Sequence, residues 1–147
     1  MKIAIGADHA GFAAKEEIKN VIRALGHQVV DEGTTSDQSV DYPDYAEKVA
    51  RSVVSGEVDR GVLICGTGIG MAIAANKIPG IRAAVITDEK PADLSRRHND
   101  SNVFAAGARI SPLPRIAEAL KVWLQTPFEG GRHQNRVNKI VALEKKP

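Results

Sequence analysis

The nine residues VLICGTGIG at positions 62–70 join a fully apolar run to a glycine-rich turn. Four consecutive apolar residues predict a buried strand of the kind that parallel sheets contain. The turn continues directly into residues 69–76, whose composition favours a short helix. A buried strand, a tight turn and a helix are the repeating parts of an α/β fold, so this stretch predicts that fold class.

The same alternation extends from this segment toward both ends of the chain. Short apolar runs predict four further strands, over residues 2–6, 28–31, 82–87 and 102–105. Longer runs with apolar residues at helical spacing predict helices over 11–25, 43–55, 89–98, 112–124 and 132–144. The pattern therefore predicts a parallel sheet in a single domain, 1–147, with an extra C-terminal helix set apart by Gly130 and Gly131.

The composition excludes several classes of protein. With 20 basic and 18 acidic residues the net charge is +2, which argues against a nucleic-acid partner. No apolar stretch approaches the roughly 20 residues of a membrane-spanning helix, and the first apolar run is too short for a signal peptide. The single cysteine, Cys65, excludes an intramolecular disulfide and argues against structural zinc. We expect a cytoplasmic protein without membrane contact.

Cys65 stands directly before three glycines at alternate positions, Gly66, Gly68 and Gly70. Such a turn can present backbone N–H groups outward as an anion site. A thiol facing those amides is expected to have a pKa below its usual 8.5 or so, which suits a general base at neutral pH. Two alternatives are that the glycines only allow close packing and that Cys65 is a small buried hydrophobe. The spacing fits neither a Walker loop nor a dinucleotide fingerprint.

Two further clusters contain polar side chains near element ends. Asp8 and His9 follow the first predicted strand, so we expect them at the same sheet edge as Cys65 and Thr67. Alternatively, Asp8 caps the next helix and His9 is a surface residue. His98 ends a predicted helix, where it is either a favourable charge at the helix C-terminus or an acid/base group that titrates near neutral pH.

Three arginines form the fourth cluster. Arg109 follows the fifth predicted strand, and Arg132 and Arg136 lie four residues apart on the last helix. Arginines at this spacing share one helix face and can hold a phosphate through forked hydrogen bonds. Two solvated arginines are the alternative for such a pair.

Six motifs together resemble one family, the type B ribose-5-phosphate isomerases and the related allose- and galactose-6-phosphate isomerases. They occur in family order and cover the chain from Lys2 to about Leu143: GADHAGF at 6–12, DYPDYA at 41–46, CGTGIG at 65–70, AANK at 74–77, SRRHNDSNV at 95–103 and EGGRH at 129–133. The resemblance implies a Rossmann-like three-layer α/β sandwich around a five-stranded parallel sheet. It also implies a homodimer or a dimer of dimers, with each active site shared between two subunits.

The resemblance assigns roles to the residues of these motifs. It implies that Cys65 moves the proton between C1 and C2 of a phosphorylated sugar. The enediolate would be stabilised by Thr67 and by the amides of Gly66, Gly68, Ile69 and Gly70. Some relatives use a glutamate after the glycine turn as the base; here Met71 stands in that position, which places this chain with the cysteine-containing relatives.

The remaining roles concern substrate binding. The resemblance implies that His98 opens the furanose ring, that Asn99 contacts a sugar hydroxyl, and that no metal or organic cofactor is needed. Substrate contacts are implied for Asp8 and His9, and a grip on the phosphate and hydroxyls for Arg109, Arg132 and Arg136. Ser101 stands where many relatives have alanine, and we expect this difference to be neutral.

Three other functions compete with a pentose-phosphate isomerase. The first is an isomerase for allose 6-phosphate or another hexose phosphate. The second is a non-catalytic module that binds phosphosugars, which would need neither a thiol nor an imidazole. The third is a thiol redox enzyme, which the absence of a second, resolving cysteine disfavours.

Overall fold

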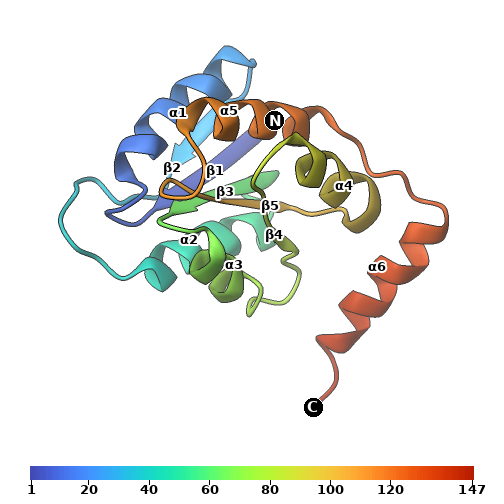
Figure 1. Cartoon of the computed structure of the whole chain (residues 1–147). Coiled ribbons are helices and arrows are strands. Elements are labelled where there is room, and N and C mark those ends of the chain that lie inside the picture. Colours follow the sequence, from blue (N-terminus) through green and yellow to red (C-terminus); the bar gives the residue numbers. More distant parts are fainter.

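The computed structural model describes residues 1–147 and builds them around a single five-stranded sheet (Figure 1). All the strands are parallel, and their order in the sheet is β2-β1-β3-β5-β4. The strands are β1 (Lys2–Ala7), β2 (Gln28–Asp31), β3 (Arg60–Cys65), β4 (Ala83–Val85) and β5 (Val103–Gly107). The predicted five-stranded parallel sheet is therefore confirmed, and β4 is shorter than the predicted 82–87.

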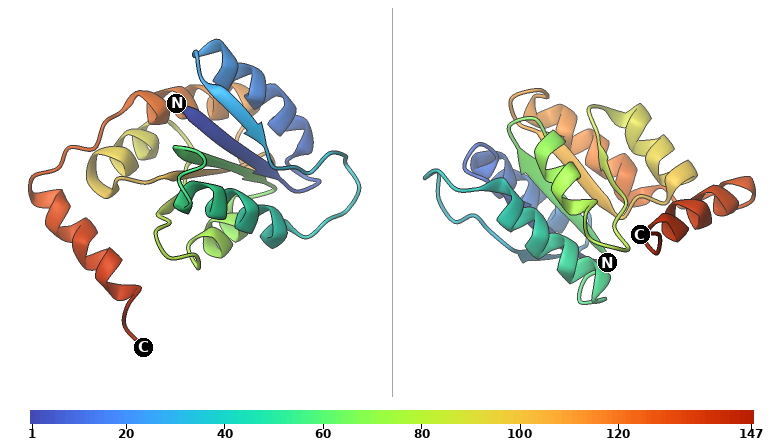
Figure 2. Two further views of the ribbon diagram at one scale, coloured as in Figure 1. Left: turned by 180° about the vertical axis from the view of Figure 1, so that it is seen from behind. Right: turned by 90° about the horizontal axis from the view of Figure 1, so that it is seen from below.

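Helices cover both faces of the sheet and complete a three-layer sandwich. They are α1 (Phe12–Ala24), α2 (Tyr42–Val54), α3 (Ile69–Ala75), α4 (Glu89–Asn99), α5 (Leu113–Gln125) and α6 (Arg132–Leu143). Figure 1 shows α1 and α5 on one face and α2 and α3 on the other. Figure 2 shows α6 beside the sandwich and outside its three layers, so the expected extra C-terminal helix is confirmed. None of these helices has the length and apolar character needed to cross a membrane.

The alternation of side chains along β3 divides them between two cores. Val62 and Ile64 pack in the core that α1 and α5 cover, whereas Leu63 and Cys65 pack in the core that α2 and α3 cover. Cys65 is the last residue of its strand and is only 4% exposed. The strand therefore delivers the thiol to the carboxyl end of the sheet, on the side where α3 begins.

Ser101 stabilises the turn that links α4 to β5. Its side chain is buried, and its Oγ accepts a hydrogen bond of 2.8 Å from Nε1 of Trp123 and donates one of 2.9 Å to Oγ of Ser95. The Arg96 guanidinium donates a hydrogen bond of 2.6 Å to the Ser101 carbonyl. An alanine would leave the buried indole N–H without a partner, so Ser101 has a role in the packing of this turn. Its expected neutrality for activity stays a prediction.

We expect Ser101→Ala to lower the free energy of unfolding by about 1–3 kcal/mol, because a buried donor loses its acceptor. In a Trp123→Phe background the same substitution should cost much less, since no indole N–H remains to be satisfied. Urea unfolding of the four proteins of this cycle measures both costs. Equal costs in the two backgrounds would show that the Trp123 hydrogen bond is not what Ser101 contributes.

Candidate active site

The carboxyl ends of β1, β3 and β5 lie next to one another at one edge of the sheet, because these strands are parallel neighbours. Asp8 and His9 follow β1, Cys65 and Thr67 lie at the end of β3, and Arg109 follows β5. The structure therefore places these five residues along one edge, as expected for the first four. We call them, with the turn 66–70, the thiol group.

Close backbone packing holds the first turn of this group against β3. A Cβ on Gly11 would overlap the carbonyl group of Ile64, the residue before Cys65. Asp8 is buried, and its Oδ1 accepts a hydrogen bond of 3.1 Å from the Gly11 N–H, so its carboxylate does stabilise the turn that begins α1. Glycine at position 11 is therefore what allows Asp8 to approach the end of β3.

His9 receives a hydrogen bond from the loop that follows β2. The Val40 N–H lies 3.2 Å from His9 Nδ1. A backbone N–H can only donate, so Nδ1 acts as the acceptor and the neutral ring carries its proton on Nε2. His9 is half-buried and not a free surface residue, and it can offer Nε2–H as a donor to a bound anion.

The glycine turn directs a backbone amide at the thiol. The Gly68 N–H donates a hydrogen bond of 3.1 Å to Cys65 Sγ. Gly68 has φ +79°, and a Cβ there would lie 2.9 Å from the carbonyl carbon of Ala106 in β5. Both the backbone conformation and the contact with β5 exclude a side chain at position 68. The turn is thus a rigid part of the sheet edge.

Arg109 places a guanidinium beside this turn. Its backbone N–H donates a hydrogen bond of 2.9 Å to the Gly66 carbonyl, and its Nη1 lies 3.3 Å from the position that a Cβ on Gly66 would occupy. The side chain is exposed. Positive charge beside the glycine turn favours the binding of an anionic oxygen there.

His98 and Asn99 lie at the opposite edge of the sheet. They end α4, whose last residues are fixed where β4 and β5 begin: Arg82 Nε donates a hydrogen bond of 3.0 Å to the Asn99 carbonyl. Cys65 pairs with Gly107, the last residue of β5. From Val103 to Gly107, β5 rises through four residue-to-residue steps of roughly 3.3 Å each, so its two ends are about 13 Å apart. One chain therefore does not bring His98 and Cys65 together.

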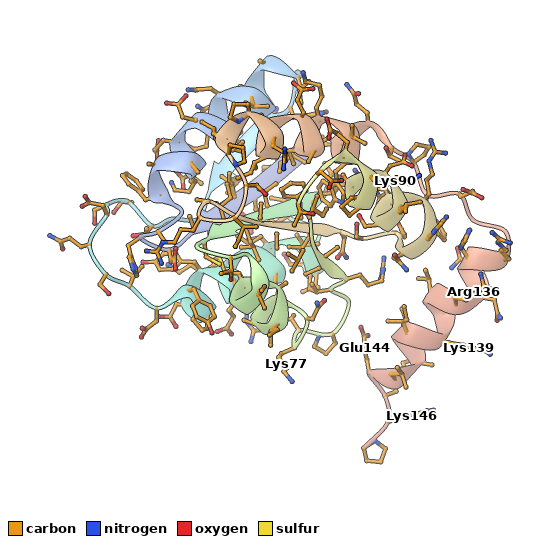
Figure 3. All side chains as sticks on the ribbon, in the orientation of Figure 1. Lys77, Lys90, Arg136, Lys139, Glu144 and Lys146 are labelled. Carbon is orange, nitrogen blue, oxygen red and sulfur yellow. The ribbon has the colours of Figure 1, made fainter.

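Helix α6 adds its arginines to the His98 edge. His133, in the first turn of α6, stacks on His98 with ring centroids 4.2 Å apart and ring planes 14° apart. Arg132 and Arg136 flank His133 on the same helix and are exposed; Figure 3 labels Arg136 there. We call His98, Asn99, Arg132 and Arg136 the imidazole group. The predicted site residues thus form two groups within one chain.

One cluster around His98 contains the side-chain types that bind metal ions. The ligand atoms of His98, Glu129 and His133 all lie within 4.8 Å of one another. The lone pairs of an imidazole lie in the ring plane, and here the two ring planes are nearly parallel and stacked. One ion cannot lie in both planes, so this arrangement does not match a metal centre with two histidine ligands.

Two residues near these groups were not predicted to have a role. His133 is buried against His98, and the ring of Tyr42 lies 2.7 Å from where a Cβ on Gly70 would be. Both occur in the family motifs, but each contact joins segments that are far apart in the sequence. No periodicity or local spacing indicates such a contact.

The two cavities of the chain lie away from Cys65. A cavity of about 520 Å³ lies between α6 and β4, the outermost strand on that side of the sheet. Its lining includes Ile140, Leu143, Arg82 and Asn99. A second, of about 430 Å³, lies beyond the end of β2, beside Asp31 and Lys48. Neither cavity is lined by Cys65, so neither of them is a pocket that leads to the thiol.

The chain is similar to known isomerases over nearly its whole length. The family model described as Ribose/Galactose Isomerase matches residues 3–140. The chain is 50% identical to ribose-5-phosphate isomerase B of Escherichia coli strain K12 over 145 residues, which cover 99% of this chain and 97% of that protein.

Solved structures agree over nearly the full length. The ribose-5-phosphate isomerase B of Clostridium thermocellum is 52% identical, with a TM-score of 0.97 and coverage of 99% of this chain and 98% of that one. The enzyme of Mycoplasma genitalium with bound ribulose-5-phosphate is 39% identical, with a TM-score of 0.94 and coverage of 99% and 97%.

A parallel α/β sandwich with a thiol among backbone amides, together with relatives of this kind, defines an aldose–ketose isomerase. More particularly, the chain belongs to the ribose/galactose isomerase family, whose model matches most of its length.

We expect Gly68→Ala to be more destabilising than Gly56→Ala. Both glycines have nearly the same positive φ, +79° at Gly68 and +78° at Gly56. Only at Gly68 would a Cβ collide with the backbone of β5. Gly56→Ala should therefore cost about 1–2 kcal/mol of unfolding free energy from backbone strain, and Gly68→Ala about twice that or more.

Gly68→Ala should also reduce turnover, because the amide that donates to Cys65 Sγ must move, whereas Gly56→Ala should keep turnover unchanged. Urea unfolding and initial rates on the two variants test this. Equal destabilisation by both substitutions would contradict the assigned contact with β5.

Proposed function

We propose that this chain interconverts ribose 5-phosphate and ribulose 5-phosphate through an enediolate, with Cys65 as the base. The observation that carries the proposal is the arrangement at the end of β3, where a thiol receives an amide hydrogen bond beside a glycine turn and a guanidinium. The substrate is supported by relatives named for ribose 5-phosphate, and by a similar structure that contains ribulose-5-phosphate.

The residues of the thiol group match the needs of the proton transfer. In the thiolate form, Cys65 removes the proton from C2 of the open-chain aldose and returns it to C1, while the O2 hydroxyl proton passes to O1. Negative charge develops on the carbonyl oxygen, where Thr67 and the amides of the turn 66–70 act as hydrogen-bond donors. The proton, the double bond and the charge are then all accounted for without a redox partner.

The imidazole group matches the ring-opening step and the binding of the phosphate. Opening a furanose removes the proton from the anomeric hydroxyl, breaks the bond between C1 and the ring oxygen, and protonates that oxygen. His98 can move this proton between the two oxygens because an imidazole has two ring nitrogens, one that can accept a proton and one that can donate one. Asn99 would contact a sugar hydroxyl, and Arg132 and Arg136 would bind the phosphate.

We further propose that the two groups meet across a homodimer, or a dimer of dimers, so that the imidazole group of one subunit faces the thiol group of the other. The opposite placement of the groups in one chain supports this arrangement. Exposed apolar side chains lie near both groups: Ile69 and Ile73 on α3, and Ile140 and Leu143 on α6. Apolar patches of this kind are typical of association surfaces.

The phosphosugar substrate also favours action in the cytoplasm, in agreement with the expectation from the sequence.

The structure offers one sheet with all six helices arranged around or beside it. We therefore propose that residues 1–147 act as one catalytic domain.

A mixing experiment tests the shared site. Cys65→Ala and His98→Ala homodimers should each convert ribose 5-phosphate very slowly, by about 10²–10⁴-fold less than the wild type, because each lacks one acid/base group. After equal amounts are unfolded together and refolded, activity should return to about a quarter of the wild-type value. Half of the random dimers are hybrids, and one of the two sites in each hybrid keeps both residues.

The same mixture decides between two arrangements. If Cys65 and His98 acted within one chain, every site of a hybrid would lack one of them and no activity would return. Allose 6-phosphate, assayed in parallel without added metal, tests the preference for a pentose phosphate. A wild-type protein that converts neither sugar would contradict the proposed function.

Arg136→Ala should raise KM for ribose 5-phosphate by at least about tenfold and change kcat less, because it removes a charge-assisted contact to the phosphate that is present before and during the reaction. Lys139→Ala, which removes a positive charge from the same helix one turn later, serves as the control and should leave KM unchanged. Steady-state kinetics on both variants measure the effect. An unchanged KM for Arg136→Ala would rule out the proposed phosphate contact.

A further inference from the structure

His133 belongs to the imidazole group by position but has no role in the mechanism above. It is 4% exposed, and its ring lies face to face with that of His98, with centroids 4.2 Å apart. The two residues come from different elements, His98 from the last turn of α4 and His133 from the first turn of α6. Their contact is one of the places where α6 touches the sandwich.

The chemistry of the buried ring is not that of an ordinary core residue. Nε2 of His133 is buried and has no hydrogen-bond partner, and the nearest carboxylate oxygen, from Glu129, is 3.8 Å away. A buried nitrogen without a partner costs free energy that an apolar side chain of similar size would not. Packing of α6 alone therefore does not account for an imidazole at this position.

The surroundings of His133 also favour its neutral form. Burial lowers the pKa of this imidazole, and the neighbouring His98 lowers it further, against the opposing influence of the Glu129 carboxylate. A neutral ring can stack closely on another imidazole whether or not that second ring carries a proton, because there is no repulsion between two positive charges.

We propose that His133 is a positioning residue whose neutral ring holds the His98 imidazole in the orientation needed for ring opening. This inference rests on the role of His98 in the proposed function. The terminal torsion of a histidine side chain is broad, so a ring at a helix end can rotate unless a neighbour restrains it. His98 is half-buried and forms no hydrogen bond within the chain through its ring, which leaves the stacking contact as its restraint.

The position of His133 has a second consequence. It lies between Arg132 and Arg136 on α6, so the helix that provides the phosphate contacts also provides the surface on which His98 rests. The covalent structure of a pentose 5-phosphate limits the distance between the phosphate and the anomeric centre. Coupling the imidazole to the helix of the arginines limits the corresponding distance in the protein as well.

Three variants test the inference. His133→Leu retains volume but removes the flat ring, and His133→Phe retains the ring but removes both nitrogens. Val137→Ala shortens a buried side chain of α6 one turn away and leaves the His133 ring unchanged. Size-exclusion chromatography and thermal unfolding establish that each variant is folded and assembled like the wild type before kinetics are measured.

Two reactions separate ring opening from proton transfer. Conversion of ribose 5-phosphate needs both, whereas exchange of the C1 hydrogen of ribulose 5-phosphate with D₂O needs no ring opening, because this ketose cannot form a furanose when its O5 is phosphorylated. We expect His133→Leu to lower kcat for conversion by about tenfold or more and to keep KM and the exchange rate within about twofold. His133→Phe should restore conversion to nearly the wild-type rate, and Val137→Ala should leave the ratio of conversion to exchange unchanged.

The inference is overturned if His133→Leu converts ribose 5-phosphate like the wild type, or if it loses conversion and exchange equally. It is also overturned if His133→Phe is as defective as His133→Leu, since the nitrogens and not the stacked ring would then be required. Failure of the proposed function is a separate result: in that case the wild type neither converts ribose 5-phosphate nor catalyses exchange, and Cys65→Ala does not differ from it.

Discussion

The common direction of the five strands is the constraint on which the rest of the structure depends. In a parallel sheet every strand ends at one edge, and every returning helix ends at the other. Residues that end or follow strands, such as Cys65 and Arg109, are thereby collected at one edge, and a residue near the end of a helix, such as His98, is carried to the opposite edge. The split between the two groups follows from the topology and not from a detail of side-chain packing.

Within the thiol group, the backbone does most of the positioning. Gly11 lets the turn after β1 reach the carbonyl of Ile64, and Gly68 lets the next turn pass against β5. These contacts leave the amide of Gly68 directed at Cys65 Sγ. A site formed by backbone groups that are wedged between strands cannot relax easily when charge develops, and this is the preorganisation that the proposed enediolate step requires.

The sequence predicts features that depend on neighbouring residues, and it does not predict features that depend on contacts between segments far apart in the chain. Strand and helix assignments depend on local periodicity, so the apolar run ending at Cys65 and the helical spacing in α5 are sufficient to predict those elements. The shared edge of Asp8, His9 and Cys65 follows from parallel topology. The role of Ser101 and the contact between His133 and His98 depend on side chains from distant segments, and no local pattern indicates them. The family motifs include these residues without stating which atoms meet.

Helix α6 depends both on its local sequence and on contacts with distant segments. Gly130 and Gly131, both at positive φ, separate it from the sandwich, and a helix of this length has little stability by itself. It is fixed near its two ends, by the stacking of His133 on His98 and by a hydrogen bond of 2.7 Å from the Gly80 N–H to Glu144. Between these points its apolar residues Ile140 and Leu143 face a cavity and stay partly exposed. A helix held in this way has a defined direction and an unfilled apolar side, which is the form expected of an element that a second subunit completes. In the proposed dimer the phosphate contacts and the ring-opening imidazole then belong to one subunit, and the proton-transfer base to the other, so that catalysis requires association.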